Sequence, residues 1–208
     1  MRGSISITGP TLTVLAAYQP NVLVGGTRDQ RVVSFASPGN SDWNSILRTT
    51  GLNIQAGATY LNQLTVYRNG TIAGGGAAHV AGVPVIGAST YTGAKSYAFL
   101  NGVQGPTVAD TSGNFGISTY GLANQASGSP ETLAGNIAEV LVYTTSLSAS
   151  QRQQVEGYLS DKWGLRSTMG GSAHPYRYSA PSFVPTQITG CSLWLDAADA
   201  TTLTVTSS

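Results

Sequence analysis

Charged residues are scarce in this sequence. Among 208 residues there are 10 lysines and arginines against 9 aspartates and glutamates, which gives a formal net charge of +1. A chain this close to neutral has no basic field for attracting nucleic acid or an anionic membrane. We therefore expect neither as a partner. The surface is expected to be neutral and polar, or covered by neighbouring subunits.

Cysteine and long apolar runs are also lacking. Cys191 is the only cysteine, which excludes an internal disulfide bond. No apolar run approaches the length of a membrane span, and the N-terminus lacks the apolar core of a signal peptide. The sequence thus predicts neither a disulfide-stapled secreted domain nor a membrane-spanning segment.

Turn-forming and β-favouring residues are abundant instead. The 26 glycines and 9 prolines, with many threonines, serines and valines, favour an all-β protein with one sandwich-sized unit. Alternating or β-branched runs between turn residues predict antiparallel strands. The predicted strands and hairpins cover residues 11–18, 21–26 with 31–36, 60–73 around Asn69-Gly70, 83–88 with 94–100, 113–118 and 137–143.

Residues 148–164 carry the signals of one helix. Ser148 is a favourable N-cap, and Gln151 can complete a capping box with it. Leu159 and Trp163 fall on one apolar face, and Gly164 can take the left-handed conformation that ends a helix. A helix this short is marginal alone, so we expect its apolar face to lie against a sheet.

The same region resembles a known family. The runs G-N-I-A-E-V-L-V-Y, at 135–143, and S-L-S-A-S-Q-R-Q-Q-V-E-G-Y-L-S-D-K-W-G-L, at 146–165, resemble the closing signature of laminin-G-like domains. These domains belong to the concanavalin A-like lectin/glucanase superfamily. The resemblance implies an antiparallel jelly-roll β-sandwich whose last long strand is followed by a short helix.

The C-terminal run G-C-S-L-W-L-D-A-A-D, at 190–199, resembles the opening strand of the same domains. The resemblance implies a sandwich over residues 1–165 that lacks its usual opening strand, a Pro/Gly/aromatic connector over 166–187, and that strand within 188–208. Three alternatives follow: a piece of a tandem array, a circular permutant, or a strand that completes a neighbouring subunit. Because an unpaired sheet edge is unfavourable, we favour completion of the sandwich, in cis or in a neighbour. The residues expected to serve this assembly are Tyr176, Tyr178, Phe183, Leu193, Trp194 and Leu195.

Catalytic patterns are missing. Hydrolases of this superfamily use paired carboxylates in an E-x-D-x-x-E pattern, whereas Glu131, Glu139 and Glu156 each stand apart from such neighbours. Glu139 is expected to be a structural ion-pair or hydrogen-bond partner. His79 and His174 have no nucleophile to serve, and we expect both on the surface. The sequence therefore predicts a protein that is not an enzyme.

Two kinds of ligand site are conceivable. Asp110 and Asn114 could offer oxygen ligands to Ca²⁺, although an ordinary turn explains them better. A sugar site needs an exposed aromatic ring with amide side chains nearby. Residues in loop-like surroundings that could form one are Trp43, Tyr91, Tyr120, Asn124 and Gln125.

Two functions are therefore weighed. The stretch from His174 to Asp199 resembles junctions in tandem laminin-G-like proteins of large DNA viruses. This resemblance implies a structural or assembly protein of the virion, a minor capsid, fibre or surface component, with other subunits as partners in a homo-oligomer or with capsid proteins. The alternative is a carbohydrate-binding module for cell-surface attachment, with glycans as partners and an extracellular or cell-surface location.

Overall fold

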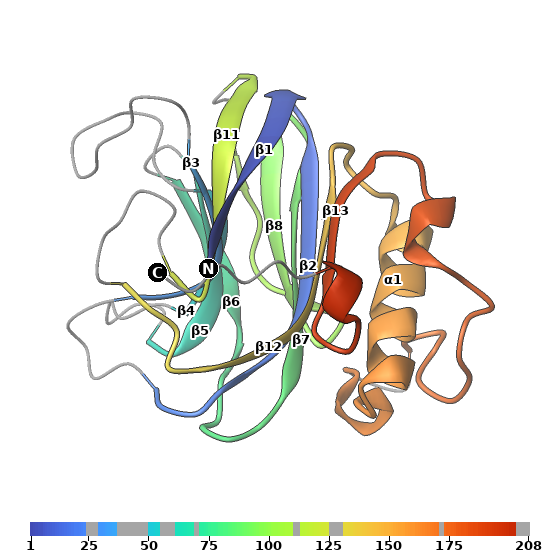
Figure 1. Ribbon diagram of the computed structural model, residues 1–208. Coiled ribbons are helices and arrows are strands. Elements are labelled where there is room, and N and C mark those ends of the chain that lie inside the picture. The colour runs from blue at the N-terminus through green and yellow to red at the C-terminus, as the bar shows by residue number, and fades with distance from the viewer. Residues whose placement is uncertain are drawn as a thin grey trace.

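Two antiparallel sheets packed face to face form the body of the protein, with one helix outside them (Figure 1). The computed structural model describes residues 1–23, 29–36, 50–54, 61–68, 71–109, 113–124, 131–170 and 173–202. The first sheet has the order β1 (Arg2–Gly9), β11 (Phe115–Leu122), β3 (Gln30–Ala36), β4 (Thr50–Ile54), β5 (Gln63–Arg68) and β6 (Thr71–Ala78). The second has the order β10 (Val108–Ala109), β8 (Lys95–Leu100), β7 (Val85–Tyr91), β2 (Leu12–Pro20), β12 (Gly135–Tyr143) and β13 (Cys191–Asp196), and β9 (Val103–Gln104) also pairs with β8.

The central strands β2 and β7 of the second sheet are buried on both faces. In β2, Val14 and Ala16 face the core between the sheets, whereas Leu15 and Ala17 face outward. All four are at most 1% exposed. Because successive strand residues point to opposite faces, a strand covered on both sides must be apolar almost throughout. The predicted all-β jelly-roll sandwich is confirmed.

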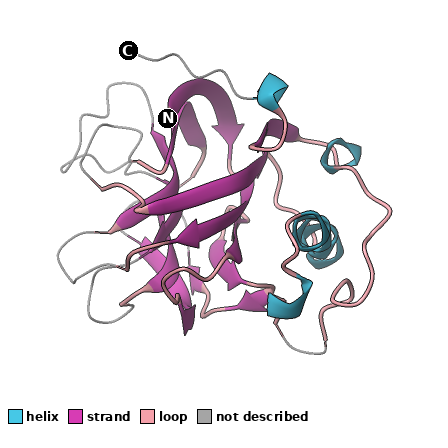
Figure 2. Cartoon of the chain, turned by 60° about the horizontal axis from the view of Figure 1, so that its bottom comes forward, coloured by secondary structure: helices cyan, strands magenta, loops and turns pink. Residues whose placement is uncertain are grey.

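Helix α1 (Ala149–Lys162) covers the outer face of the second sheet (Figure 2). Ser148 is its N-cap and forms the predicted capping box with Gln151. Gly164 follows the helix with a φ of 68°, as expected for a helix-ending glycine. Val155 and Leu159 are fully buried against the sheet. Short 3₁₀ helices span Arg166–Thr168, Pro185–Gln187 and Ala200–Thr202.

Two of the predicted strand pairings are present. β5 pairs with β6, and β7 pairs with β8. Asn101 and Gly102 have φ angles of 50° and 78° and join β8 to β9 in a tight turn. The Asn69-Gly70 turn lies outside the described residues. The hairpin of 21–26 with 31–36 is wrong, because β3 is paired on one side with β11 and on the other with β4.

The C-terminal strand lies beside a strand of its own chain. β13 is antiparallel to β12, with Leu195 opposite Val140 and Trp194 opposite Leu141. This is the pairing described by the circular-permutant alternative. The connector before it passes on the side of α1 away from the sheets (Figures 1 and 2). Exchange of β13 between subunits stays a prediction.

Candidate functional site

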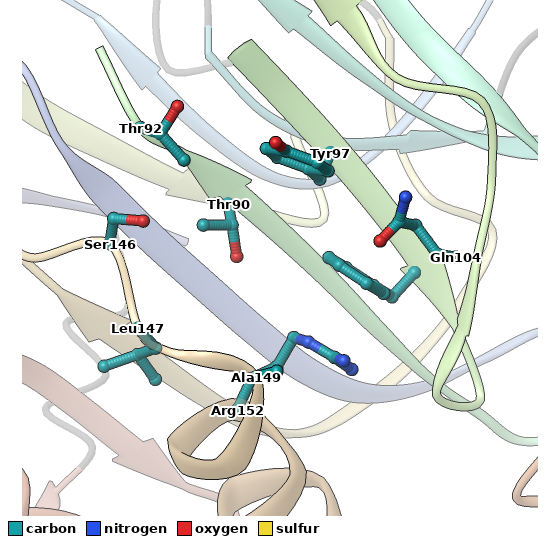
Figure 3. Close-up of a pocket in the computed structure, with 9 residues that line it drawn as sticks. Thr90, Thr92, Tyr97, Gln104, Ser146, Leu147, Ala149 and Arg152 are labelled. Atoms are coloured by element: carbon teal, nitrogen blue, oxygen red, sulfur yellow. The ribbon is translucent and has the colours of Figure 1, made fainter. Parts of the chain in front are cut away.

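A pocket of about 280 Å³ opens on the outer face of the second sheet, beside the first turn of α1 (Figure 3). Strands β7, β8 and β9 supply one wall, and the loop after β12 with the start of α1 supplies the other. Its lining residues are Thr90, Thr92, Tyr97, Phe99, Gln104, Ser146, Leu147, Ala149 and Arg152.

Two aromatic rings from β8 form the apolar part of the pocket. Ala98 and Leu100 belong to the core between the sheets, so Tyr97 and Phe99 point to the outer face. Their rings are stacked, with centroids 6.4 Å apart and planes inclined by 18°. Phe99 is buried, whereas Tyr97 is half-buried and keeps part of its ring open to solvent. Tyr97 thus offers a flat apolar platform to a ligand.

Arg152 is held against Phe99, the neighbour of this platform, by buried polar contacts. Its guanidinium lies 3.8 Å from the ring centroid of Phe99, and its Nη1 donates to Oε1 of Glu156 at 2.6 Å. Nε2 of His174 lies 3.1 Å from the other oxygen of Glu156. The backbone N–H of Tyr176 donates to Nδ1 of His174, so the ring proton is on Nε2, which donates to Glu156. His174 of the connector thereby holds Glu156 in place, and Glu156 holds Arg152.

Polar groups surround the aromatic platform. Thr92, Gln104 and Ser146 contribute hydroxyl and amide groups to the lining. Thr90 is only 5% exposed, and its Oγ1 has no hydrogen-bond partner among the described residues. A buried hydroxyl of this kind is satisfied by a bound water or ligand. No carboxylate is among the described residues that line the pocket.

At its C-terminal end, α1 is fastened by Glu139. This buried strand residue is 1% exposed. Its Oε1 accepts from the Tyr158 hydroxyl at 2.9 Å and from Trp194 Nε1 at 2.6 Å. Its Oε2 accepts from Trp163 Nε1 at 2.7 Å and lies 2.9 Å from Lys162 Nζ. The predicted structural role of Glu139 is confirmed: it joins β12, β13 and α1.

The ionisation of the donors around Glu139 reflects this network. Lys162 also forms an ion pair with Asp196. Burial lowers the pKa of Lys162, but hydrogen bonds to Asp196, Glu139 and Tyr158 outweigh it and raise the pKa above its ordinary value. Burial raises the pKa of Tyr158 to about 12. Both donors therefore keep their protons across the physiological range.

A second pocket of about 280 Å³ lies at the other end of α1. It has no charged side chain among the described residues that line it, and Nε2 of Gln19 already donates to the Gly82 carbonyl. The Trp163 ring and the exposed amide of Asn136 are its most distinctive groups. The complete lining is Ala17, Tyr18, Gln19, Pro84, Asn136, Ile137, Ala138, Trp163 and Leu165.

Among the described residues, the two tyrosines predicted for a sugar site are buried. Tyr91 ends β7 and is fully buried, with its ring edge-to-face on Phe115 at 5.6 Å between centroids. Tyr120 lies within β11, is 9% exposed and packs over Gly3. The expectation that these tyrosines lie in loops is wrong, because both point into the core. Neither ring is open to a ligand from solvent.

Two other predicted ligand residues, Asn124 and Asn114, are described and are not among the residues that line the pocket. Asn124 is half-buried, and its carbonyl accepts from Ser34 Oγ at 2.7 Å. Asn114 is exposed just before β11. Among the described residues, no group of three or more histidine, cysteine or acidic side chains could hold a metal ion. The expectation of an ordinary turn rather than a calcium site at Asp110 and Asn114 stays a prediction. Trp43, Asp110 and Gln125 lie outside the described residues.

Both histidines are buried, which corrects the expectation of surface positions. His174 is 5% exposed because it is enclosed between the connector and α1. His79 is 3% exposed. Its Nδ1 donates to the Asn62 carbonyl at 2.7 Å, so its Nε2 accepts from the Tyr18 hydroxyl at 2.7 Å. Burial lowers the pKa of His79 and raises that of Tyr18.

Most residues predicted for assembly make contacts within the chain. Trp194 donates to Glu139, and Leu193 and Leu195 pack on the core between the sheets. Tyr176 lies against Gly157 of α1, and Phe183 meets Tyr158 edge-to-face at 6.2 Å. Tyr178 is 76% exposed. Partner subunits stay a prediction. None of the described helices is long and apolar enough to cross a membrane.

Sequence reasoning missed the pocket residues Tyr97, Thr90 and Arg152. A signal was present: Tyr97 and Phe99 alternate with small or aliphatic residues on a strand whose other face belongs to the core. Two aromatic rings on the outer face of a strand point to a surface that must be covered or used. Arg152 reaches the same place only through the packing of α1, which the sequence does not specify.

Comparisons with known proteins show the fold. The sequence matches no protein-family profile and no curated protein. A candidate carbohydrate-binding protein from Bacteroides ovatus has a TM-score of 0.58 and 13% identity over 93% of this chain, which spans only 48% of that protein. The SAP-like pentraxin of Limulus polyphemus has a TM-score of 0.56 and 14% identity, with 74% of each chain covered. The CBM40 of a Ruminococcus gnavus IT-sialidase, solved with α2,3-sialyllactose, has a TM-score of 0.53 and 16% identity, covering 73% of this chain and 95% of that one.

Proposed function

We propose that this protein is a non-enzymatic carbohydrate-binding module and that the pocket beside the first turn of α1 is its binding site. The observation that carries the proposal is the Tyr97 ring, held flat by Phe99 and surrounded by hydroxyl, amide and guanidinium groups. A pyranose has an apolar C–H face and a polar rim. It is bound by an aromatic ring under the face and hydrogen bonds at the rim.

Binding is favoured over hydrolysis by the positions of the glutamates. Oε2 of Glu131 accepts from Nε of Arg31 at 2.7 Å. Glu139 is engaged in the network at the C-terminal end of α1, and Glu156 in the network at its middle. None of the three lines the pocket, and none of the described lining residues carries a carboxyl group, whereas glycoside hydrolysis uses a pair of them.

The structural neighbours add support from the fold. They include a candidate carbohydrate-binding protein and a sialidase CBM40. At identities of 13% and 16%, the ligand of a neighbour cannot be assigned to this chain. An extracellular or cell-surface location would follow from a glycan-binding role. The virion role has no comparable observation behind it and stays a prediction.

A glycan array followed by calorimetry tests the proposal. The wild-type chain should bind a defined set of glycans, and Tyr97→Ala should weaken that binding by at least about tenfold because it removes the platform. Tyr178→Ala is the matched control, since this tyrosine is exposed and remote from the lining. It should bind as wild type does. Loss of binding in Asn136→Ala but not in Tyr97→Ala would move the site to the second pocket, and no binding by a folded chain would refute the function.

A further inference from the structure

Resting on the proposed function, we infer that the pocket prefers sugars that carry a carboxylate and that Arg152 determines this preference. Arg152 is the one charged side chain among the described residues that line the pocket. It is only 8% exposed, so a ligand carboxylate would meet its charge in a poorly hydrated environment. Charge pairs are stronger there than in open water.

The guanidinium has donors to spare. Glu156 uses Nη1 alone, and among the described residues no other group accepts a hydrogen bond from Arg152. Stacking on Phe99 fixes the plane of the guanidinium, and the Arg152 side chain reaches from α1 into the pocket (Figure 3). A planar group with free N–H donors and a fixed orientation matches the geometry of a carboxylate.

Two further features favour a negative charge at this place. Ala149 of the first helical turn lines the pocket, and that turn contains no acidic residue. The N-terminal end of a helix attracts anions through its free N–H groups. Independently, the unpartnered Oγ1 of buried Thr90 can donate a hydrogen bond to a ligand oxygen.

Glu156 limits the size of the effect. Its charge offsets part of the charge of Arg152, because its Oε1 accepts from Nη1 of Arg152 at 2.6 Å. The acidic sugar is therefore expected to gain a moderate advantage, about tenfold in affinity, over its neutral counterpart. The advantage should shrink as the salt concentration rises.

Paired ligands test the preference on the wild-type protein. Calorimetry or ligand-observed NMR compares methyl β-D-glucuronide with methyl β-D-glucoside, and 3′-sialyllactose with lactose, at low and at near-physiological salt. Tighter binding of the acid in either pair supports the inference, and the pair that responds distinguishes a hexuronate from a sialate. Equal binding of acid and neutral sugar, still abolished by Tyr97→Ala, overturns the acid preference and leaves the proposed function standing. Absence of binding by any of the four refutes the preference, and the glycan array then decides the function separately.

Two variants locate the preference in Arg152. Glu156→Gln removes the competing carboxylate and should increase the ratio of acidic to neutral affinity. Arg152→Gln combined with Glu156→Gln removes one positive and one negative charge, so the net charge is that of wild type. This double variant should lose the acid preference. Thermal unfolding by circular dichroism checks that both variants fold. A folded double variant with the wild-type preference would rule out Arg152 as the determinant.

Discussion

Replacing Glu139 by glutamine tests whether one carboxylate fastens α1 and β13 to the sandwich. Each carboxylate oxygen serves two donors: Oε1 accepts from Tyr158 and Trp194, and Oε2 meets Trp163 and Lys162. In glutamine one of these oxygens becomes an NH₂ group. Two donors would then face another donor, whichever way the amide is turned.

The expected loss follows from the hydrogen bonds that are broken. Each bond to a charged group contributes about 1.5–3 kcal/mol. Lys162 keeps Asp196 as a partner, so the loss comes from the two donors that would face the amide NH₂ group. We therefore expect Glu139→Gln to lower the free energy of unfolding by about 3–6 kcal/mol, and the melting temperature by roughly 6–24 °C for a chain of this size. Urea unfolding followed by tryptophan fluorescence measures the loss.

The matched control is Asp161→Asn, the same carboxylate-to-amide change at an exposed ion pair. Asp161 pairs with Arg166, and the side chains are 44% and 35% exposed. This change should cost less than about 1 kcal/mol because water screens the pair. A Glu139→Gln loss no larger than that of the control would refute the view that Glu139 holds these elements together.

Three further predictions concern the protonation of His79, the packing of Gly157 in α1 against Tyr176, and strand β13. Burial lowers the pKa of His79, and the hydrogen bond to the Asn62 carbonyl opposes this only in part. As the pH falls, the unfolded chain therefore protonates His79 at a higher pH than the folded chain does. The contribution of His79 to the free energy of unfolding should be fully present above pH about 6.5 and decrease as the pH falls below it. In urea titrations His79→Gln should reduce this decrease in the free energy of unfolding. An unchanged decrease would assign it to other groups. Gly157→Ala should lower the free energy of unfolding by about 1–3 kcal/mol, despite the better helix propensity of alanine, because the new Cβ would lie 2.5 Å from Tyr176 Cβ. In a chain that also carries Tyr176→Gly, the Gly157→Ala change should cost much less. Equal costs of Gly157→Ala in the two chains would contradict this steric explanation. Deleting residues 186–208 removes β13 and exposes the edge of β12, so light scattering should detect aggregated or unfolded chain, whereas a folded monomer would count against the need for this strand.

Features coded by neighbouring residues were predictable. The capping box of Ser148 and Gln151 and the Gly164 helix end depend on contacts within a few residues, and they were read correctly. The tight turn at Asn101-Gly102 follows for the same reason. Strand β1 was not predicted, because only Ile5 and Ile7 mark its apolar face and the rest of the segment is polar or glycine.

Features that depend on distant partners were not predictable. His79 is buried because it meets Tyr18, which is 61 positions away, and no local pattern announces that contact. Tyr91 and Tyr120 resemble loop aromatics in the sequence but fill the core, since the sheet packing decides which face of a strand is covered. The pocket escaped notice because Tyr97 and Arg152 come from different elements and meet only when α1 docks.

The attachment of α1 at its middle and at its C-terminal end has a kinetic consequence for any ligand beside it. Glu139 fastens the end of the helix and Glu156 ties its middle to the connector, so the wall that carries Arg152 is already in place before a ligand arrives. Little chain entropy remains to be lost on association. We expect association to need no slow closure step, so that affinities for different sugars differ mainly in their dissociation rates.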